Sequence, residues 1–262
     1  SLIKVMSTAT YAIISVIIVS LVAVIGAIPL LIKKKVSKRL LLFLLSISVG
    51  VILSTVFMDF LPEAVSHGYT LGVALNILAG FLVLFVVEKF VHWHHSKKCA
   101  ESDHGHGHAY NLAPINLIGD GVHNFIDGLV IAGSYAVNIS LGITATISII
   151  FHEVPQEIAD FGVLLYSGYS KKKALFFNFL SAITAILGTV IGLILVSRLH
   201  NFTQFIIPFA AGNFLYIAAS NLLPELHRHC KLKDSLLHLL AILIGIGIIV
   251  LVVLYGPVHS HG

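Results

Sequence analysis

Two short segments concentrate the residues whose side chains could bind a metal ion. Residues 117–128 read I-G-D-G-V-H-N-F-I-D-G-L, and residues 151–161 read F-H-E-V-P-Q-E-I-A-D-F. At 100° per residue, the polar positions of each segment fall on one face of a helix, within about 100° and about 140° respectively. The two faces carry Asp120, His123, Asn124 and Asp127, and His152, Glu153, Gln156, Glu157 and Asp160.

The surroundings of these faces indicate what the acids bind. Both segments are otherwise apolar, and a carboxylate at the centre of a membrane helix costs about 2.5–3.5 kcal/mol. The acids must therefore face the interior of a helix bundle, where they need a cationic partner. No lysine or arginine lies between residues 99 and 170. The imbalance of charge indicates a divalent cation.

The types of ligand narrow the choice of metal. Imidazole combined with carboxylate suits Zn²⁺, Fe²⁺ and Mn²⁺, whereas Mg²⁺ and Ca²⁺ prefer sites built of oxygen alone. His123 with Asp127, and His152 with Gln156, are spaced i, i+4, so each pair can point at one centre. A second metal position sharing Asp127 is left open. A lone membrane histidine would instead indicate a hydrogen bond between helices.

Pro155 lies among the ligands of the second segment. Proline has no backbone N–H, so the carbonyl of Phe151, four residues earlier, loses its helical hydrogen bond. Such breaks are tolerated where they line protein or a watery cavity. The proline predicts either a bend that widens the helix pair around an ion or an ordinary kink.

Composition indicates which elements hold these residues. Of 262 residues, 57% are hydrophobic and 11% charged, with a mean hydropathy of +0.98. A soluble domain carries about 25% charged residues, so a cytosolic enzyme, a nucleic-acid-binding domain and a disordered scaffold are excluded, and no nucleic-acid partner is expected. Charge-free windows cover 5–32, 40–58, 64–87, 174–197, 199–224 and 235–262.

Each window is long enough for the roughly 20 residues of a membrane-crossing helix. The polar segments 113–136 and 139–166 add two, which makes eight spans. The first window is expected to be a span rather than a cleavable signal sequence, because it is long and has no basic leader. We expect one membrane transporter domain, residues 1–262, in the lipid bilayer.

Basic residues give the orientation. With eight spans, 14 of the 16 lysines and arginines lie on one side of the membrane. The positive-inside rule makes that side cytoplasmic. Both termini are then extracytoplasmic, and the plasma membrane is the expected location. Whether the chain forms a homodimer is left open.

An internal repeat relates the two halves. Residues 59–63 read D-F-L-P-E and residues 221–225 read N-L-L-P-E, an offset of 162 that also pairs Gly50 with Gly212. In the eight-span topology the two copies cross in opposite directions. The sequence thus predicts an all-α bundle of eight transmembrane helices with an inverted repeat relating spans 1–3 and 6–8, as in many transporters. A chance match between leucine-rich segments is the alternative.

The motifs H-N-F-I-D-G (123–128) and H-E-V-P-Q-E-I-A-D-F (152–161) resemble the signature of the ZIP metal transporters, the zinc- and iron-regulated transporter-like family. They are most similar to its LIV subfamily, whose fifth-span pattern is H-E-x-P-H-E-x-G-D. The resemblance covers the whole chain. It implies metal ligands at His123, Asn124, Asp127, His152, Glu153 and Gln156.

Departures from the family pattern lie close to these ligands. Gln156 replaces the second histidine of the subfamily motif, and Ala159 replaces its glycine. An amide is a weaker, neutral ligand, so affinity or metal preference is expected to differ. Some relatives complete a second metal position with a carboxylate in span six, where this chain offers Ser181.

Polar residues outside the six ligands are expected around the site or along the ion's path. They are Asp59, Asp120, Glu157, Asp160 and Asn221. The cytoplasmic loop at about 92–111 is histidine-rich, with H-W-H-H and H-G-H-G-H. Such tracts bind metal weakly; the alternative is a solvated loop that transport does not need.

The sequence therefore predicts uptake of a divalent transition metal into the cytoplasm, through a site between spans four and five. Zinc is favoured, with Fe²⁺, Mn²⁺ or Cd²⁺ as further substrates, and no cofactor is expected. The resemblance implies alternating access, in which spans one, four, five and six slide against the rest. Two alternatives remain: an intramembrane metal-dependent hydrolase, although Gln156 breaks the H-E-x-x-H pattern, and a metal exporter.

Overall fold

The computed structural model describes residues 2–32, 37–101, 112–227 and 232–255, and these residues form helices and short connections. The all-α prediction is confirmed for this part of the chain. The elements are α1 (Leu2–Ile32), α2 (Lys38–Thr55), η1 (Val56–Phe60), α3 (Leu61–Ala64), α4 (Leu71–Glu101), α5 (Leu112–Val137), α6 (Ile139–Tyr166), α7 (Lys171–Arg198), α8 (Phe202–Tyr216), η3 (Ile217–Leu222), α9 (Leu223–His227) and α10 (Leu232–Tyr255).

Two continuous helical rods, α2–η1–α3 and α8–η3–α9, contain a π-helical turn in their interior. η1 joins α2 to α3, and η3 joins α8 to α9, without a break. Each π-turn directly precedes a Leu-Pro-Glu sequence, and the N–H of Leu61 donates to the carbonyl of Val56, five residues back. A proline ring clashes with the carbonyl four residues earlier. The wider π-turn accommodates Pro62 and Pro224 without ending the helix.

Among the residues that the structure describes, six helical rods are long and apolar enough to cross a membrane: Thr8–Gly26, Arg39–Ala64, Leu71–Phe90, Lys171–Arg198, Phe202–His227 and Asp234–Tyr255. Helices α5 and α6 are not among them, because they carry the two polar stripes. They are nevertheless as long as the others, and their acids point inward. Of those acids, Asp127, Glu153 and Glu157 are fully buried. The number of spans therefore stays a prediction.

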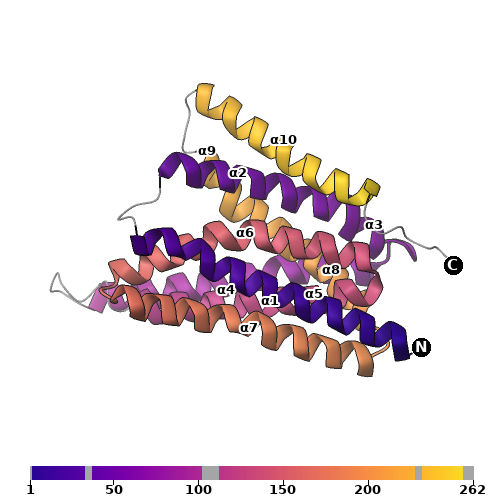
Figure 1. The fold of residues 1–262 in the computed structure, drawn as a ribbon. Coiled ribbons are helices and arrows are strands. Elements are labelled where there is room, and N and C mark those ends of the chain that lie inside the picture. The colour runs from indigo at the N-terminus through magenta and orange to yellow at the C-terminus, as the bar shows by residue number, and fades with distance from the viewer. Residues whose placement is uncertain (1, 33–36, 102–111, 228–231, 256–262) are drawn as a thin grey trace.

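The rods lie roughly side by side, and α1 begins at the end of the bundle where α10 finishes (Figure 1). Large apolar side chains on the outer faces of α1, α4 and α10 are exposed, including Leu21, Leu78 and Leu243. The main core gathers around α8, where Ile206, Ala210 and Phe214 are buried. Exposed leucine outside and buried polar residues inside are the arrangement expected in lipid.

Glycines allow three helix pairs to approach at backbone distance. In α5 against α7, a Cβ added at Gly128 would lie 2.0 Å from the carbonyl oxygen of Ala185. Gly50 of α2 lies as close to α10, and Gly212 of α8 lies as close to α4. Small residues at such crossings are typical of membrane helix packing.

The histidine-rich segment predicted at about 92–111 lies outside what the structure describes in side-chain detail. Residues 102–111 are outside the described ranges, and for 91–101 only the helical backbone of α4 is described.

Candidate metal site

Helices α5 and α6 form an antiparallel hairpin that brings the two polar stripes together. A single residue, Asn138, connects them, and its side chain accepts a hydrogen bond from the N–H of Leu141 at 2.8 Å, capping α6. This N-cap starts α6 immediately after α5 ends. The tight connection sets the register in which the stripes face each other.

Four buried side chains converge between these helices: His123, Asp127, His152 and Glu153. The Nε2 atom of His152 lies 3.0 Å from Oδ2 of Asp127 and 3.2 Å from Nε2 of His123. The Nε2 atom of His123 is 3.3 Å from Oε1 of Glu153 and 3.7 Å from Asp127 Oδ2. The two histidine rings meet edge to face.

These spacings are close to those of a tetrahedral zinc site. Zn–N and Zn–O bonds of about 2.0–2.2 Å place neighbouring ligand atoms about 3.3–3.6 Å apart. The five measured separations among the four ligand atoms run from 3.0 Å to 3.8 Å. Within the described residues, the ion-pair contacts of Asp127 and Glu153 are with the two histidines. Oδ1 of Asp127 is buried without a hydrogen-bond partner there.

The backbone of α6 orients His152. Its Nδ1 atom lies 2.9 Å from the carbonyl oxygen of Ser148. A carbonyl only accepts, so Nδ1 carries a hydrogen, which leaves Nε2 as the ring atom that faces the cluster and can bind a metal. On its far side His152 packs edge to face against Phe214 of α8. A metal-binding histidine is commonly fixed through its other ring nitrogen in this way.

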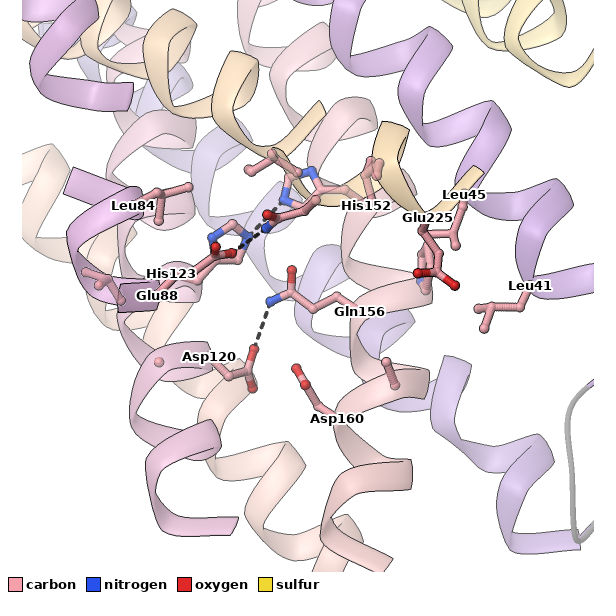
Figure 2. Close-up of a pocket in the computed structure, with 17 residues that line it drawn as sticks. Leu41, Leu45, Leu84, Glu88, Asp120, His123, His152, Gln156, Asp160 and Glu225 are labelled. Atoms are coloured by element: carbon pink, nitrogen blue, oxygen red, sulfur yellow. Dashed lines mark hydrogen bonds between the residues drawn. The ribbon is translucent and has the colours of Figure 1, made fainter. Parts of the chain in front are cut away.

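The two predicted amide ligands contact Asp120 instead of the four-residue cluster. Nδ2 of Asn124 donates to Oδ1 of Asp120 at 3.0 Å, and Nε2 of Gln156 donates to the same oxygen at 3.2 Å. Figure 2 shows the Gln156 amide lying between His152 and Asp120. That Asn124 and Gln156 bind the metal therefore stays a prediction.

A second acidic group adjoins the first. Carboxylate oxygens of Asp120, Glu153 and Glu157 lie within 4.8 Å of one another, and all three residues are buried. Both oxygens of Glu157 lack a hydrogen-bond partner in the described part of the chain. The two groups share Glu153, whereas the sequence suggested Asp127 as the shared residue.

A cavity of about 530 Å³ connects the site with one end of the bundle. Its inner wall includes His123, His152 and Asp120, as Figure 2 shows. Its lining also includes acidic and polar residues from three rods, namely Glu88, Asp160, Asn221 and Glu225. The lining extends to the beginning of α2, at Leu41.

Glu88 is the wall residue that sequence reasoning missed. Its carboxylate accepts hydrogen bonds from the hydroxyl of Tyr216, at 2.6 Å, and from the side-chain amide of Asn221. Glu88 is next to Lys89 at the end of an apolar window. An acid at such a position is typical of the interface between membrane and water and does not by itself indicate a site. Its partners are more than 120 residues away, so no local pattern could have revealed the contact.

The remaining predicted pathway residues are divided among three places. Asp160 and Asn221 line the cavity, and Asp120 and Glu157 lie beside the cluster. Asp59 is buried in η1, away from the cavity wall. Ser181, noted for lacking a carboxylate, is buried in α7.

Fold and site together define a bundle of long apolar helices around a buried histidine–carboxylate cluster. Comparison with known proteins supplies the family: the profile described as ZIP Zinc transporter matches residues 6–115 and 108–253. The chain belongs to the ZIP zinc transporter family. That family consists of transporters rather than enzymes, which agrees with the prediction that the protein is not an enzyme.

Individual relatives carry related names. The chain is 35% identical to "Zinc transporter ZIP10" of Homo sapiens over 189 residues, which cover 65% of this chain and 22% of that protein. It is 38% identical to the Danio rerio protein of the same name, over 55% of this chain and 18% of the relative. "Metal cation symporter ZIP14" of Xenopus tropicalis is 29% identical, over 84% of this chain and 62% of the relative. The chain thus matches about a fifth of the length of the ZIP10 relatives.

Proposed function

We propose that this chain transports a divalent transition metal ion, first of all zinc, into the cytoplasm. The observation that carries the proposal is the convergence of the buried ligand atoms of His123, Asp127, His152 and Glu153 beside a cavity that the two histidines line. Relatives named as zinc transporters support it. The ion is the substrate and not a cofactor; Fe²⁺, Mn²⁺ and Cd²⁺ are the further substrates that such ligands admit.

The cavity mouth supports the direction. Leu41 lies one turn from Lys38 and Arg39, and Glu88 is followed by Lys89, so the mouth lies at the basic end of the bundle. The positive-inside rule places that end in the cytoplasm. The cavity then opens inward, and both termini are extracytoplasmic. The plasma membrane is the location we propose.

Eight spans within one transport domain, residues 1–262, fit the bundle. Helices α5 and α6 reach as far along it as the six apolar rods, and their polar faces are buried. A buried polar face removes the main cost of placing such a helix in lipid. We therefore count α5 and α6 as spans four and five.

Two structural parallels support the inverted repeat. A π-turn precedes the Leu-Pro-Glu sequence in both copies, in η1 and η3. In addition, Gly50 packs α2 against α10, and its repeat partner Gly212 packs α8 against α4. The repeat equates span two with span seven and span three with span eight. Applied to the pair α2–α10, spans two and eight, it gives the pair α8–α4, spans seven and three. These matching contacts favour a repeat over a chance similarity between leucine-rich segments.

Packing also supports alternating access. One group consists of α1, α5, α6 and α7, and the other of α2, α4, α8 and α10. The close contacts between glycine and backbone at Gly128, Gly50 and Gly212 each join helices within one group. The metal cluster belongs wholly to the first group. Sliding of that group against the second would carry the ion across.

We further propose that Asp120, Glu153 and Glu157 form a second cation position on the way to the cytoplasm. Sharing Glu153 would let the ion pass between the two groups without leaving protein ligands. Asn124 and Gln156 would hold Asp120 for this step and complete the ion's shell. Asp160 and Asn221 would follow in the cavity, and Asp59 would lie on the outer path.

Uptake into proteoliposomes tests the proposal directly. The wild type is compared with the double variant His123→Ala plus His152→Ala, using Zn²⁺, Fe²⁺, Mn²⁺ and Mg²⁺. His238→Ala is the matched control, because His238 is also buried in a helix but lies in α10, outside the cluster. We expect zinc uptake by the wild type and the control, and loss of uptake in the double variant.

Other outcomes point elsewhere. Zinc uptake by the folded double variant would refute the assignment of the site. Zinc binding without uptake by any variant would refute transport and favour the alternative function, a metal-dependent hydrolase. Zinc movement only out of vesicles with right-side-out protein would indicate an exporter.

A further inference from the structure

Pro155 leaves a carbonyl oxygen of α6 without its helical partner. Proline carries no N–H, so the carbonyl of Phe151 receives no hydrogen bond from the residue four positions later. In the interior of a membrane bundle an unsatisfied carbonyl is costly. The structure provides a donor from another helix: the hydroxyl of Ser48, in α2, lies 2.5 Å from the Phe151 oxygen.

Phe151 is the acceptor that needs this hydroxyl. Ser48 is fully buried, and its Oγ also lies 2.9 Å from the carbonyl of Leu44 in its own helix. A hydroxyl has a single hydrogen to donate. The Leu44 carbonyl already has the ordinary helical partner, the N–H of Ser48, whereas Phe151 has none. The proton is therefore better placed toward Phe151.

A second hydroxyl contact joins the same two helices. Thr55, two turns beyond Ser48 on α2, lies with its Oγ1 2.5 Å from Oγ of Ser148. The carbonyl of Ser148 is the group that holds Nδ1 of His152. The hydroxyls of α2 thus contact α6 at two points, on the stretch of α6 that carries the cluster histidine.

We propose that Ser48 is a positioning residue of the transport site, whose hydroxyl takes the carbonyl released by Pro155 and holds α6 against α2 in the inward-opening state. The inference rests on the proposed function, because α2 and α6 belong to the two groups that slide. Movement of α6 along α2 must break this bond and leave the Phe151 carbonyl to find another donor. The bond therefore favours the state in which the cavity is open.

Accessibility of the cavity measures the balance between states. Ala159 is exposed and lines the cavity, so Ala159→Cys in a background of Cys99→Ser and Cys230→Ser reports its opening. The readout is the rate of modification by a charged, membrane-impermeant thiol reagent. A buried hydrogen bond of ordinary strength predicts that Ser48→Ala slows this rate about two- to ten-fold.

Ser46→Ala is the matched control. Ser46 is as fully buried in α2 as Ser48, but its hydroxyl donates to Leu42 in its own helix, at 2.7 Å. We expect a modification rate within about two-fold of the parent for Ser46→Ala. Ser48→Thr keeps the hydroxyl and should restore most of the rate. Equal rates for Ser48→Ala and Ser46→Ala would overturn the proposal.

Combining Ser48→Ala with Pro155→Ala separates this role from a general packing effect. Alanine at 155 returns an N–H to α6, so Phe151 regains its helical donor and no longer needs Ser48. The effect of Ser48→Ala should then fall to within about two-fold of no change. If the single variant cannot be recovered folded, the double variant should be recoverable. An undiminished effect, or failure of the double variant to fold, would overturn the proposal.

Failure of the proposed function looks different. If the wild type moves no metal, transport is refuted whatever the labelling rates are. If zinc uptake is normal but the labelling rates do not change with the Ser48 and Pro155 substitutions, the proposal of transport is retained and the role of Ser48 is refuted.

Discussion

Replacing Gly128 by alanine should disable the metal site without touching a ligand. Gly128 follows Asp127 in α5 and lies against α7, where an added Cβ would be 2.0 Å from the carbonyl oxygen of Ala185 and 2.7 Å from the N–H nitrogen of Thr189. Both neighbours are backbone atoms, which cannot rotate away. Ordinary contact begins at 3.4 Å, so the helices must separate by about 1.4 Å. The hydrogen bond from Thr189 to the Gly128 carbonyl would also be strained.

Such a shift is large on the scale of metal coordination. Metal sites tolerate about 0.2 Å in ligand distance, and the Asp127 carboxylate moves with the backbone beside it. We expect the dissociation constant for zinc to rise about ten- to hundred-fold, the range seen when the support of a ligand is lost. Overpacking should also destabilise the fold by about 1–3 kcal/mol, partly offset by about 1 kcal/mol of helix propensity gained by alanine.

Zinc titration calorimetry and thermal unfolding, both in detergent, measure the two effects. Gly162→Ala in α6 is the matched control, because nothing lies within 4 Å of a Cβ added there. That variant should gain the helix propensity and bind zinc normally. If Gly128→Ala binds zinc as tightly as Gly162→Ala, the helix contact does not position Asp127 and the reasoning is wrong.

Three further outcomes are expected. Asn138→Ala removes the cap of α6 and should lower stability by about 1 kcal/mol, seen as a lower melting temperature; an unchanged one would mean that the 2.8 Å cap contributes nothing. Tyr135→Phe leaves the buried Ser15 hydroxyl without its 2.7 Å partner and should destabilise more than Tyr135→Phe combined with Ser15→Ala; the reverse order in thermal melts would contradict this. Zinc uptake should fall as pH is lowered from about 7.5 to about 5.5, because protonation of ligands opposes metal binding; flat uptake in intact vesicles would argue against histidine ligands.

The position of the candidate site could be predicted from the sequence because charged and polar residues are costly inside apolar helices. Acids and histidines on one face of an apolar helix have few stable arrangements, and two such helices in succession must turn those faces toward each other. The structure places Asp127 and His152 in contact, as the stripes predicted. The roles of Asn124 and Gln156 could not be read in the same way, because an amide can donate to a carboxylate through its nitrogen or bind a metal through its oxygen.

The wall of the cavity was harder to predict because it depends on distant pairings. Glu88 lies at the end of an apolar window, and only the packing of α4 on α8 brings it to Tyr216. The π-turns were equally hidden, although Pro62 and Pro224 were visible. A proline predicts a missing hydrogen bond, but whether the helix kinks, ends or widens depends on what packs beside it.

Ser48 shows most clearly which contacts cannot be predicted from the sequence. Ser46, Ser48 and Ser54 all lie in α2, all are buried, and serine is inexpensive in a membrane helix because its hydroxyl can bond to its own backbone. Ser46 and Ser54 do so, donating to Leu42 and Gly50 respectively. Only the register of α2 against α6 brings one of the three to the carbonyl that Pro155 releases. The sequence identifies the orphaned acceptor, but the donor is decided by tertiary packing.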